Sequence, residues 1–388
     1  MSPSAAAASP SVRPLAGLTV LDLSRVLAGP YATQLLGDLG ATVWKVERPG
    51  DGDETRAWGP PFVGGTSAYF LSVNRNKRSA ALDFRDPVHR EALQRAAVRA
   101  DVVVENFLPG ALVPFGLDPA TLRARHPGLV VCSITGYGQD GPYASLPGYD
   151  AVLQGFVGLQ SVTGPPEAGY KVGVALIDVL TGTHAAAAVL AALVGKLRTG
   201  VGAHLDVALA EVGVHALVNV AQSALSTGTP ARRHGNAHPT IVPYQTFAAA
   251  DGAFVLAVGN DGQWARVCEA MGSPEQAARW GRNPERVLHR TEVVAWLAER
   301  FARESRAHWI ERFRAAGVPV GPVREVHEAV ADPALAMRGM VATHTLPDGT
   351  ATPLLGLPWG VDGARPPVSP PPVELGRDTA AFLAEYGA

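Results

Sequence analysis

An aspartate between two apolar runs is the residue whose type and position most directly suggest chemistry. Asp178 follows the short run Gly173 to Ile177 and precedes a helical pattern from Thr181 to Arg198. The N-terminus of a helix presents free N–H groups and a partial positive charge. A carboxylate at this junction is therefore expected to stay ionised and can act as a nucleophile. Aspartate is also one of the commonest helix N-caps, so the pattern alone leaves both roles open.

Two basic stretches have the residue types that bind anions. The run Asn74 to Arg78 (NRNKR) includes Lys77, and Arg48 ends the run Lys45 to Arg48 (KVER). Basic side chains neutralise phosphates and carboxylates well. Salt-bridged surface loops have the same composition, so contact with a ligand and pairing on the surface both remain open.

Two further polar side chains stand where a ligand could meet them. Asn106 follows a strand pattern that begins at Asp101, and Tyr149 stands in the string GYD. The amide of Asn106 could bond an adenine or a pantetheine amide, or it could close its own turn. Tyr149 could place a phenol in a cleft, or it could pack with its hydroxyl bonded elsewhere.

The stretch His234 to Pro239 (HGNAHP) contains two histidines four residues apart. A proline opposes a helix there and no carboxylate is near, so we predict no metal site. A flexible glycine loop over an active site and an inert linker are the two interpretations that remain. No GxSxG motif, phosphate-binding loop or Cys/His nucleophile pair stands out in the sequence.

The elements that must position these residues follow a strand–helix–strand pattern. Leu18 to Leu23 and Ala41 to Val46 are short branched runs typical of strands. Between them, apolar residues at helical spacing begin near Pro30 and end at Gly40. Short connections of this kind predict a parallel sheet in an α/β fold.

Two later strand patterns end in polar or glycine residues. The first run, Asp101 to Phe107, has the polar pair Glu105-Asn106 near its end. The second run, Leu129 to Thr135, is followed by Gly136-Tyr137-Gly138. Such endings place side chains at the carboxyl edge of a sheet, where open α/β sheets bind ligands. The first strand–helix loop has no GxGxxG, so a dinucleotide enzyme is not indicated.

The rest of the chain predicts a second, smaller domain. Helical patterns cover 211–226, 262–271 and 291–316, strand patterns cover 242–258, and a final helix covers 379–386. We expect a loose tail at 1–13, a large domain from 14–227 and 326–388, and a small domain at 228–325.

Composition excludes several classes of function. The formal net charge is −2 and 18% of residues are charged, so a nucleic-acid-binding surface is not expected. Two distant cysteines, Cys132 and Cys268, indicate reduced thiols in a cytoplasmic protein. The most apolar stretch, Ala185 to Val194, has about half the ~20 residues of a membrane crossing, so no membrane partner is expected.

Several long strings are similar to one known family. They are LAGLTVLDLSRVLAGPYATQLLGDLGATVWKVERPGDGDETR, NRNKRSAALDF, ADVVVENFLPGALVPFGLD, ITGYGQDGPYASLPGYDAVLQG, VGVALIDVLTGTHAAAAVLAAL, GNAHPTIVPYQTF and GVPVGPVREVHEAVADP. In this order they resemble the family III CoA-transferases, also called the CaiB/BaiF family, from about Leu15 onward. The resemblance implies an interlocked homodimer, with a Rossmann-like large domain from both chain ends and a smaller central α/β domain.

The resemblance also implies a mechanism and a set of contacts. Asp178 matches the family's nucleophile. The family's reaction proceeds through an aspartyl anhydride and an aspartyl-CoA thioester, and it needs no general base. Coenzyme A is then a substrate, and no permanently bound cofactor is expected. The matching CoA-binding positions are Leu27, Ala28, Arg48, Lys77, Leu82, Asn106, Phe107 and Tyr149, and the substrate loop contains Gly235, Asn236, Ala237 and His238.

The substrate class is an expectation from the same resemblance. The substrate loop resembles members that use succinyl-CoA and small dicarboxylates, and Leu27 departs from the Gln of formate-transferring relatives. We hypothesise that Arg232, Arg233 and His238 bind a second carboxylate.

Two alternatives remain. An α-methylacyl-CoA racemase needs two acid/base groups, and its histidine is replaced by Tyr149, whose phenol is a poor base at neutral pH. A non-catalytic acyl-CoA-binding protein would not need Asp178.

Overall fold

The computed structural model describes residues 13–346 and 348–387. The expected loose tail lies outside the described residues, except for Arg13. The chain divides into two compact units. The large unit comprises the described residues of 1–159, 172–227 and 333–388, and the small unit comprises 160–171 and 228–332.

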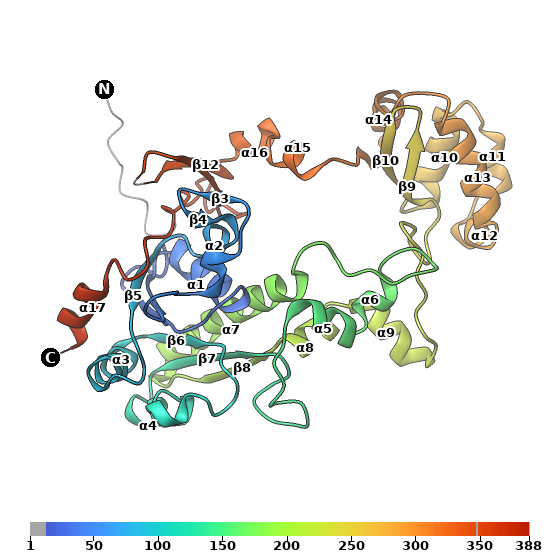
Figure 1. Ribbon diagram of the computed structural model, residues 1–388. Helices are drawn as coiled ribbons and strands as arrows, with labels where there is room; N and C mark the ends of the chain where they lie inside the picture. The colour runs from blue at the N-terminus through green and yellow to red at the C-terminus, as the bar shows by residue number, and fades with distance from the viewer. Residues whose placement is uncertain (1–12, 347, 388) are drawn as a thin grey trace. The chain divides into compact units, whose positions relative to one another are not determined.

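A six-stranded sheet forms the centre of the large unit (Figure 1). Its strands are β1 (Thr19–Asp22), β2 (Thr42–Glu47), β5 (Lys77–Ala81), β6 (Val102–Glu105), β7 (Val130–Thr135) and β8 (His204–Ala208). Their order is β5-β2-β1-β6-β7-β8, and every neighbouring pair is parallel. The order reverses between β1 and β6, which is the position where open α/β sheets bind ligands. The predicted α/β fold with a parallel sheet is confirmed.

The helices of the large unit include those that cover both faces of this sheet. They are α1 (Ala28–Asp38), α2 (Ala68–Val73), α3 (Pro87–Arg99), α4 (Pro119–Arg125), α5 (Asp150–Phe156), α7 (Leu176–Thr199), α8 (Leu209–His215), α9 (Val218–Thr227), α16 (Pro333–Met337) and α17 (Thr379–Tyr386), with the short 3-10 helices η2 (Glu54–Ala57) and η3 (Val113–Phe115). Helix α6 (Leu159–Val162) lies where the chain passes between the units. Apolar residues of α1, α5, α7 and α8 join one core layer, and those of α3, α4 and α17 join the other.

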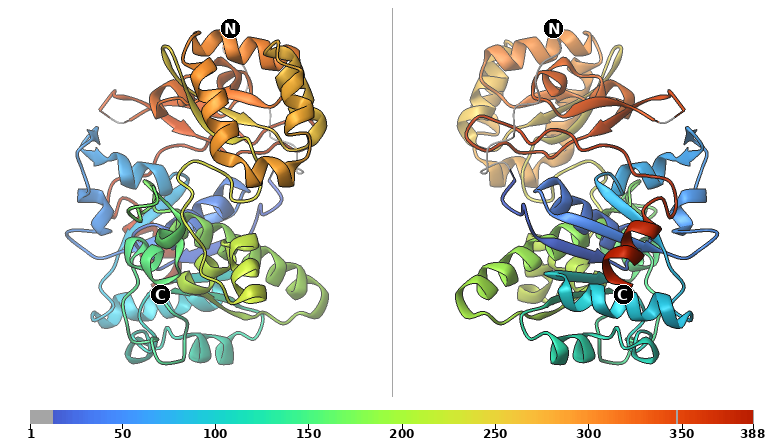
Figure 2. Two further views of the ribbon diagram at one scale, coloured as in Figure 1. Left: turned by 90° about the vertical axis from the view of Figure 1, so that its right-hand side faces the viewer. Right: turned by 90° about the vertical axis from the view of Figure 1, so that its left-hand side faces the viewer.

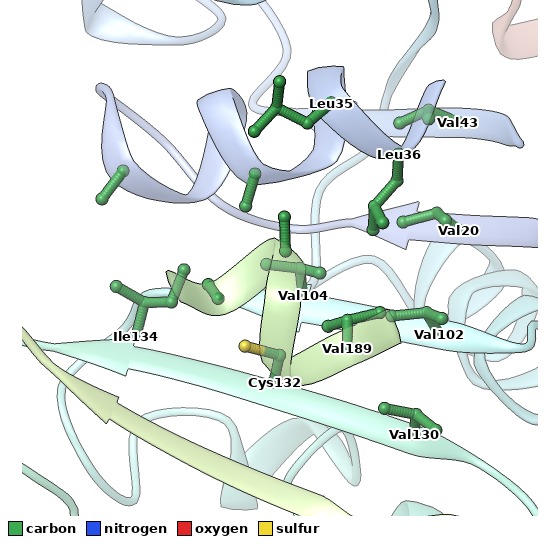
Figure 3. Close-up of a cluster of buried hydrophobic side chains, with 14 of the residues drawn as sticks. Val20, Leu35, Leu36, Val43, Val102, Val104, Val130, Cys132, Ile134 and Val189 are labelled. Atoms are coloured by element: carbon green, nitrogen blue, oxygen red, sulfur yellow. The ribbon is translucent and has the colours of Figure 1, made fainter. Parts of the chain in front are cut away.

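Alternate strand residues enter the two core layers, as the two-residue period of a strand requires. Val20, Val43, Val102 and Val130 pack in the layer of α1 and α7 (Figure 3). Their neighbours Leu21, Trp44, Val103 and Val131 pack in the layer of α3 and α17. Because both faces are buried, the strands are almost continuous apolar runs, which is why they were recognisable in the sequence.

The end of the chain returns to the large unit. Helix α17 lies beside α3 and β5 (Figures 1 and 2). The Ala81 N–H donates to Thr379 Oγ1 at 2.9 Å, and the ring of Phe382 meets Trp44 edge-on with centroids 5.2 Å apart. Two hairpins belong to the same unit, β3 (Phe62–Val63) with β4 (Thr66–Ser67), and β12 (Val341–Thr345) with β13 (Ala351–Leu355).

The small unit has an antiparallel sheet of order β11-β10-β9 covered by helices. Its elements are β9 (Tyr244–Ala249), β10 (Gly252–Ala257), α10 (Asp261–Ala270), α11 (Glu275–Arg279), α12 (Asn283–Leu288), α13 (Arg290–Phe301), α14 (Arg306–Ala315), β11 (Val320–Pro322) and α15 (Val326–Val330). Phe254, Phe301 and Trp309 lie in its apolar core. Buried Arg286 donates to the carbonyls of Val242 and Trp280, which ties the start of β9 to α12.

Two predicted helices are each two helices in the structure. The pattern at 211–226 is interrupted at Val218, where φ is +44°, and the pattern at 291–316 is interrupted between α13 and α14, where Ser305 caps α14. Apolar periodicity continues across a short break when both helices face one core, so periodicity alone does not find the break.

Helix α7 is longer than predicted, because it begins at Leu176 rather than at Thr181. By length and composition alone it is a candidate to cross a membrane. Core helices of water-soluble proteins pass the same test, and Ile177, Ala185 and Val189 of this helix are fully buried in the apolar core.

Candidate active site

A cavity of about 140 Å³ lies where the strand order reverses. It is lined by Arg25, Val26, Leu27, Ala28, Asn106, Phe107, Leu108, Ile134, Thr135, Gly136, Pro147, Gly148, Tyr149, Asp178 and Leu209. These residues lie at or after the ends of β1, β6 and β7, or at the starts of α1, α5, α7 and α8. The structure therefore brings together Asp178 and five of the predicted contact residues, Leu27, Ala28, Asn106, Phe107 and Tyr149.

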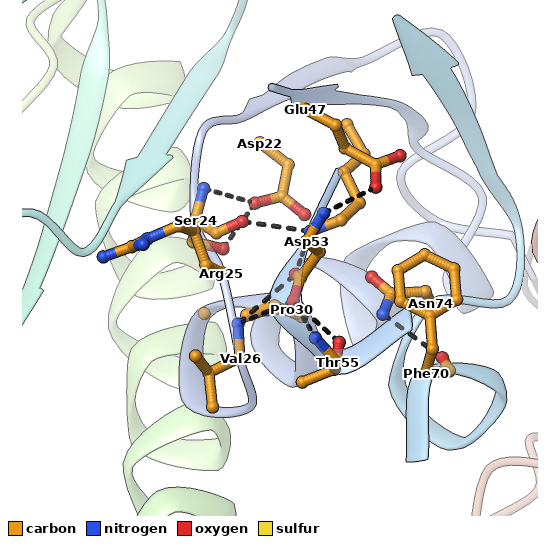
Figure 4. A network of polar contacts seen from close by, with 12 residues as sticks. Asp22, Ser24, Arg25, Val26, Pro30, Glu47, Asp53, Thr55, Phe70 and Asn74 are labelled. Atoms are coloured by element: carbon orange, nitrogen blue, oxygen red, sulfur yellow. Dashed lines mark hydrogen bonds and ion pairs between the residues drawn. The ribbon is translucent and has the colours of Figure 1, made fainter. Parts of the chain in front are cut away.

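The loop after β1 adopts a conformation that its sequence does not favour. Val26 has φ of +69°, a region in which a β-branched residue is a genuine outlier. Its N–H faces the Asp53 carboxylate at 3.3 Å, and Lys45 Nζ donates to both Asp53 and the Ser24 carbonyl (Figure 4). A buried ion pair thus holds the loop that lines the cavity, in agreement with the tendency of strained backbone to cluster at functional sites.

Asn106 is bonded to this loop rather than free for a ligand. Its Oδ1 accepts from the Arg25 N–H at 2.9 Å, and its Nδ2 donates to the Arg25 carbonyl at 2.8 Å. The Arg25 guanidinium lies over the Phe107 ring, 5.7 Å from its centroid. The loops after β1 and β6 are therefore joined, and Asn106 shapes the cavity through the loop it holds.

Asp178 lies inside the first turn of α7, two residues after the first helical residue, so it is not the N-cap. The N-cap is Ala175, whose side chain makes no capping bond. Burial, and then the neighbouring charge of Asp150, raise the pKa of Asp178 to about 7. The helix end was expected to keep this carboxylate fully ionised. Its pKa is instead raised, because desolvation and a like charge outweigh the helix dipole.

Tyr69 of α2 is a neighbour that the sequence did not single out. Burial, and then the carboxylates of Asp178, Asp150 and Asp53, raise the pKa of Tyr69 to about 12. Its hydroxyl therefore keeps its proton at neutral pH and can donate a hydrogen bond. The only signal in the sequence was an aromatic run before the basic cluster, which is more often a packing signal.

Comparison with known proteins decides the family. The model of the family described as CoA-transferase family III matches residues 15–379. The chain belongs to CoA-transferase family III. The resemblance noted from the motifs is confirmed, and so is the prediction that the protein is an enzyme of CoA transfer.

Relatives of this family III enzyme match over nearly all of its length. A succinate–glutarate CoA-transferase of Agrobacterium fabrum is 41% identical, over 96% of this chain and 95% of the relative. A human succinyl-CoA:glutarate CoA-transferase is also 41% identical, over 97% of this chain and 86% of the relative. A CaiB/BaiF family protein from Brucella suis has a crystal structure with a TM-score of 0.86 at 42% identity, covering 96% of this chain and 99% of that one.

Three of the CoA contacts expected from the family lie outside the lining of this cavity. Lys77 is buried and its ammonium donates to Asp22 Oδ2, the Pro30 carbonyl and Asn74 Oδ1, at 2.8–3.0 Å. All three donors are used, so this arrangement favours a structural role over contact with phosphate. Lys77 is the first residue of β5 and is buried, so it does not lie on a surface loop.

Leu82 and Arg48 have opposite surroundings. The Leu82 side chain is buried in the apolar core, and its N–H donates to the Glu47 carbonyl. Arg48 is exposed after the end of β2 and pairs with Asp51 at 2.9 Å. Exposed pairs of this kind are weak, so Arg48 can exchange this partner for a phosphate.

The predicted substrate loop belongs to the small unit. Gly235 has φ of +58° with open space around it, the Ala237 N–H bonds the His234 carbonyl, and the His238 ring meets Tyr244 with centroids 5.3 Å apart. Asn236 is exposed.

Arg233 is fastened to backbone near this loop. Its guanidinium donates to the carbonyls of Ser161, Pro165 and Pro166. Three of its five N–H donors are therefore engaged. The hypothesis of carboxylate binding is better carried by its neighbour Arg232, which is exposed.

No cluster of three or more His, Cys, Asp or Glu residues with metal-binding geometry occurs among residues 13–346 and 348–387. Cys132 and Cys268 are buried and unpaired, and burial raises the pKa of each thiol to about 12. Neither sulfur is therefore a nucleophile at neutral pH.

Proposed function

We propose that this enzyme moves coenzyme A from succinyl-CoA to a small dicarboxylic acid such as glutarate, with Asp178 as the covalent nucleophile. The observation that carries the proposal is a partly buried carboxylate of raised pKa in the lining of the cavity at the sheet's carboxyl edge. The substrates follow the names of relatives that are 41% identical to this chain.

The proposed chemistry needs only carboxylates and a thiolate. A carboxylate oxygen of Asp178 attacks the thioester carbon of succinyl-CoA, the C–S bond breaks, and CoA leaves as thiolate. The thiolate then attacks the Asp178 carbonyl carbon of the mixed anhydride, which releases succinate and leaves an aspartyl-CoA thioester. The acceptor carboxylate repeats the two steps in reverse, so Asp178 is regenerated and the acceptor departs as its CoA ester.

The N-terminus of α1 supports charge stabilisation in these steps. Helix α1 begins at Ala28 after Leu27, and both residues line the cavity. The first-turn N–H groups of a helix lack intrahelical partners and bear a partial positive charge. We infer that they receive the oxyanion or the departing thiolate, as preorganised N–H groups do in other acyl transfers.

A group of basic side chains on the small unit supports recognition of a second carboxylate. Partial burial, and then the charges of Arg290, Arg232 and His238, lower the pKa of His234, so these groups lie near one another. Arg290 also donates to the Pro239 carbonyl at 2.8 Å. We infer that Arg232 and Arg290, with His238, form an anion-binding group on the small unit that recognises a carboxylate of the acceptor.

The finer architecture is part of this proposal. The six strands lie in the order β5-β2-β1-β6-β7-β8. Numbered along the chain, this is the order 3-2-1-4-5-6 of a Rossmann-like domain, which supports that assignment for the large domain. Exposed Leu197 of α7 and Leu225 of α9 support an interlocked homodimer, because such side chains are costly to leave in water. Domain bounds at 14–227, 228–325 and 326–388, no permanent cofactor, and a cytoplasmic location remain proposals.

The test uses the purified chain with succinyl-CoA and a panel of mono- and dicarboxylates, with CoA products read by mass spectrometry. Glutaryl-CoA should form, and Asp178→Ala should abolish it. Hydroxylamine added during turnover should trap a hydroxamate on Asp178. Undiminished transfer by Asp178→Ala would remove the proposed mechanism.

The acceptor site has a separate test. Arg232→Ala and Arg290→Ala should each lower kcat/KM for glutarate about tenfold, the loss typical of a charged hydrogen bond. The monocarboxylate butyrate, which lacks the second charge, is the matched control and should lose little. Equal losses for both acids, or none, would contradict the assignment.

A further inference from the structure

Helix α7 is capped from outside by another helix. Its own N-cap residue, Ala175, makes no side-chain bond. Instead Asp150, the first residue of α5, accepts from the N–H groups of Ile177 at 2.8 Å and Asp178 at 3.3 Å through the same oxygen, Oδ1. Asp150 is 27 and 28 residues away from its partners along the chain, so this cap exists only in the folded protein.

The capping carboxylate is itself held in place. Gln154, one turn later on α5, is fully buried and donates from Nε2 to Asp150 Oδ2 at 2.7 Å. Its Oε1 accepts from the Val172 N–H at 2.7 Å, and its Nε2 also lies 3.3 Å from the Val174 carbonyl. Gln154 therefore ties Asp150 to the segment that leads into α7.

This arrangement bears on the orientation of Asp178. Aspartate in the first turn of a helix can bond the free N–H groups of that turn with its own side chain. Here the N–H groups of Ile177 and Asp178 are taken by Asp150. No hydrogen bond to the Asp178 carboxylate occurs within residues 13–346 and 348–387, and Asp178 lines the cavity.

We propose that Asp150 is a positioning residue which occupies the amides at the start of α7, so that the Asp178 carboxylate is left free to attack the thioester. The inference rests on the proposed role of Asp178 as nucleophile. It gives Asp150 and Gln154 a function that does not involve contact with the substrate.

The charge of Asp150 adds a second effect. Asp150 from α5 and Tyr69 from α2 interact electrostatically with Asp178, and Arg25 and Tyr149 line the same cavity. Tyr69 keeps its proton, so the like charge of Asp150 opposes ionisation of Asp178 and makes its carboxylate more basic. A more basic carboxylate is a stronger nucleophile and is still ionised close to neutral pH.

The test is the pH dependence of adduct formation in Asp150→Asn. Removing the like charge should move the acid limb of the Asp178 adduct rate to lower pH by about one unit. The value of kcat should fall about tenfold, because the amide puts a donor where Asp150 Oδ2 accepted from Gln154 and so disturbs the cap. KM for succinyl-CoA should change less than about twofold, because Asp150 does not touch substrate.

Matched variants separate this role from folding. Asp86→Asn makes the same change at the N-cap of α3, where Asp86 accepts from Val88 and His89, and it should leave the profile unchanged. Asp150→Ser keeps a capping oxygen without the charge and should show the same shift, which covers the case in which Asp150→Asn does not fold. Asp150→Glu, which retains the charge, should keep the wild-type acid limb.

Two failures are distinguishable. An acid limb that stays at the wild-type pH in the Asn and Ser variants would overturn the inference about Asp150, while the nucleophile stands. Absence of any Asp178 adduct in the wild-type enzyme would overturn the proposed function and this inference with it.

Discussion

Asp178 combines burial, a like-charged neighbour and a place in the first turn of a helix. Burial and Asp150 raise its pKa to about 7, against the stabilising effect of the helix end. Its surroundings therefore do not stabilise the ionised carboxylate. This is consistent with a nucleophile and not with an aspartate whose role is to cap the helix. Tyr69, which keeps its proton at neutral pH, interacts electrostatically with it.

The first prediction at this scale concerns activity. Asp178 must be ionised to attack, so the rate of adduct formation with succinyl-CoA should fall as pH drops below about 7. Single-turnover mass spectrometry from about pH 5 to about pH 9 measures the rate of adduct formation. An acid limb near ~4, the ordinary value for aspartate, would contradict the strong desolvation of Asp178.

The second prediction concerns stability. The pKa of Asp178 is about 7 in the fold and near its ordinary ~3.9 in the unfolded chain. The folded state therefore binds more protons in this window, and the protein loses stability as pH rises from ~4 to ~7. Asp178→Asn removes the buried charge and should stabilise the fold by on the order of 2 kcal/mol at pH 8 and by little at pH ~4.

Thermal unfolding of wild type and Asp178→Asn at these two pH values is the measurement. Asp140→Asn, at an aspartate outside the cavity lining, is the control. A gain of equal size at both pH values would mean that the charge of Asp178 is not the cause.

At the scale of elements, β1, β2 and β5 share a buried polar network under the loop that lines the cavity. Asp22 of β1 pairs with Lys77 of β5 at 3.0 Å, and Lys45 of β2 pairs with Asp53 at 2.8 Å. Burial alone would raise the pKa of Asp22, but the charges of Lys77 and Lys45 hold it at about 2. These pairs link β1 and β5 to each other and β2 to Asp53, whose carboxylate faces the N–H of Val26 in the turn.

Lys77→Met should therefore destabilise the large unit by about 3–5 kcal/mol, the cost of leaving a buried charge without its partner. Arg85→Met, which breaks the exposed pair of Arg85 with Asp83, is the matched control and should cost less than about 1 kcal/mol. Denaturant unfolding measures both. If Lys77→Met instead kept stability and only weakened CoA binding, the phosphate contact expected from the family would be restored.

At the scale of the whole molecule, the described surface includes large apolar side chains on α7 and α9. Leu197 and Leu225 are 86% and 82% exposed. Large apolar side chains are costly to leave in water, and a partner chain can cover each of them. In the proposed homodimer, the partner would cover them.

Light scattering should therefore give twice the mass of the chain at micromolar concentration. Leu197→Glu combined with Leu225→Glu should reduce the yield of dimer at least severalfold, because each change places a charge against apolar surface. Leu288→Glu, at an 80% exposed leucine of α12, is the control. A monomeric wild-type protein, or a double variant that dimerises normally, would contradict the proposed interface.

Much of the fold was predictable because its signals are local. The strands of the large sheet are short branched runs with polar ends, and their helices carry apolar residues at helical spacing. The positions of Leu27 and Asn106 at the sheet edge follow from those endings, whereas Tyr149 and Asp178 reach it at the starts of α5 and α7. Leu82 and Lys77, which the resemblance predicts as CoA contacts, are buried in the structure. The sequence did not indicate that burial, since it depends on residues far away along the chain.

What the sequence determined by itself was the family, the parallel α/β pattern and the place of Asp178 at the start of a long helix, because these depend on neighbouring residues. Tertiary structure alone decided which groups surround that carboxylate. Asp150 reaches it from 28 residues away, and Lys77 reaches Asp22 across 55 residues. Charge and burial act through space, so the raised pKa of Asp178 and the loss of Lys77 as a free cation are properties of the fold.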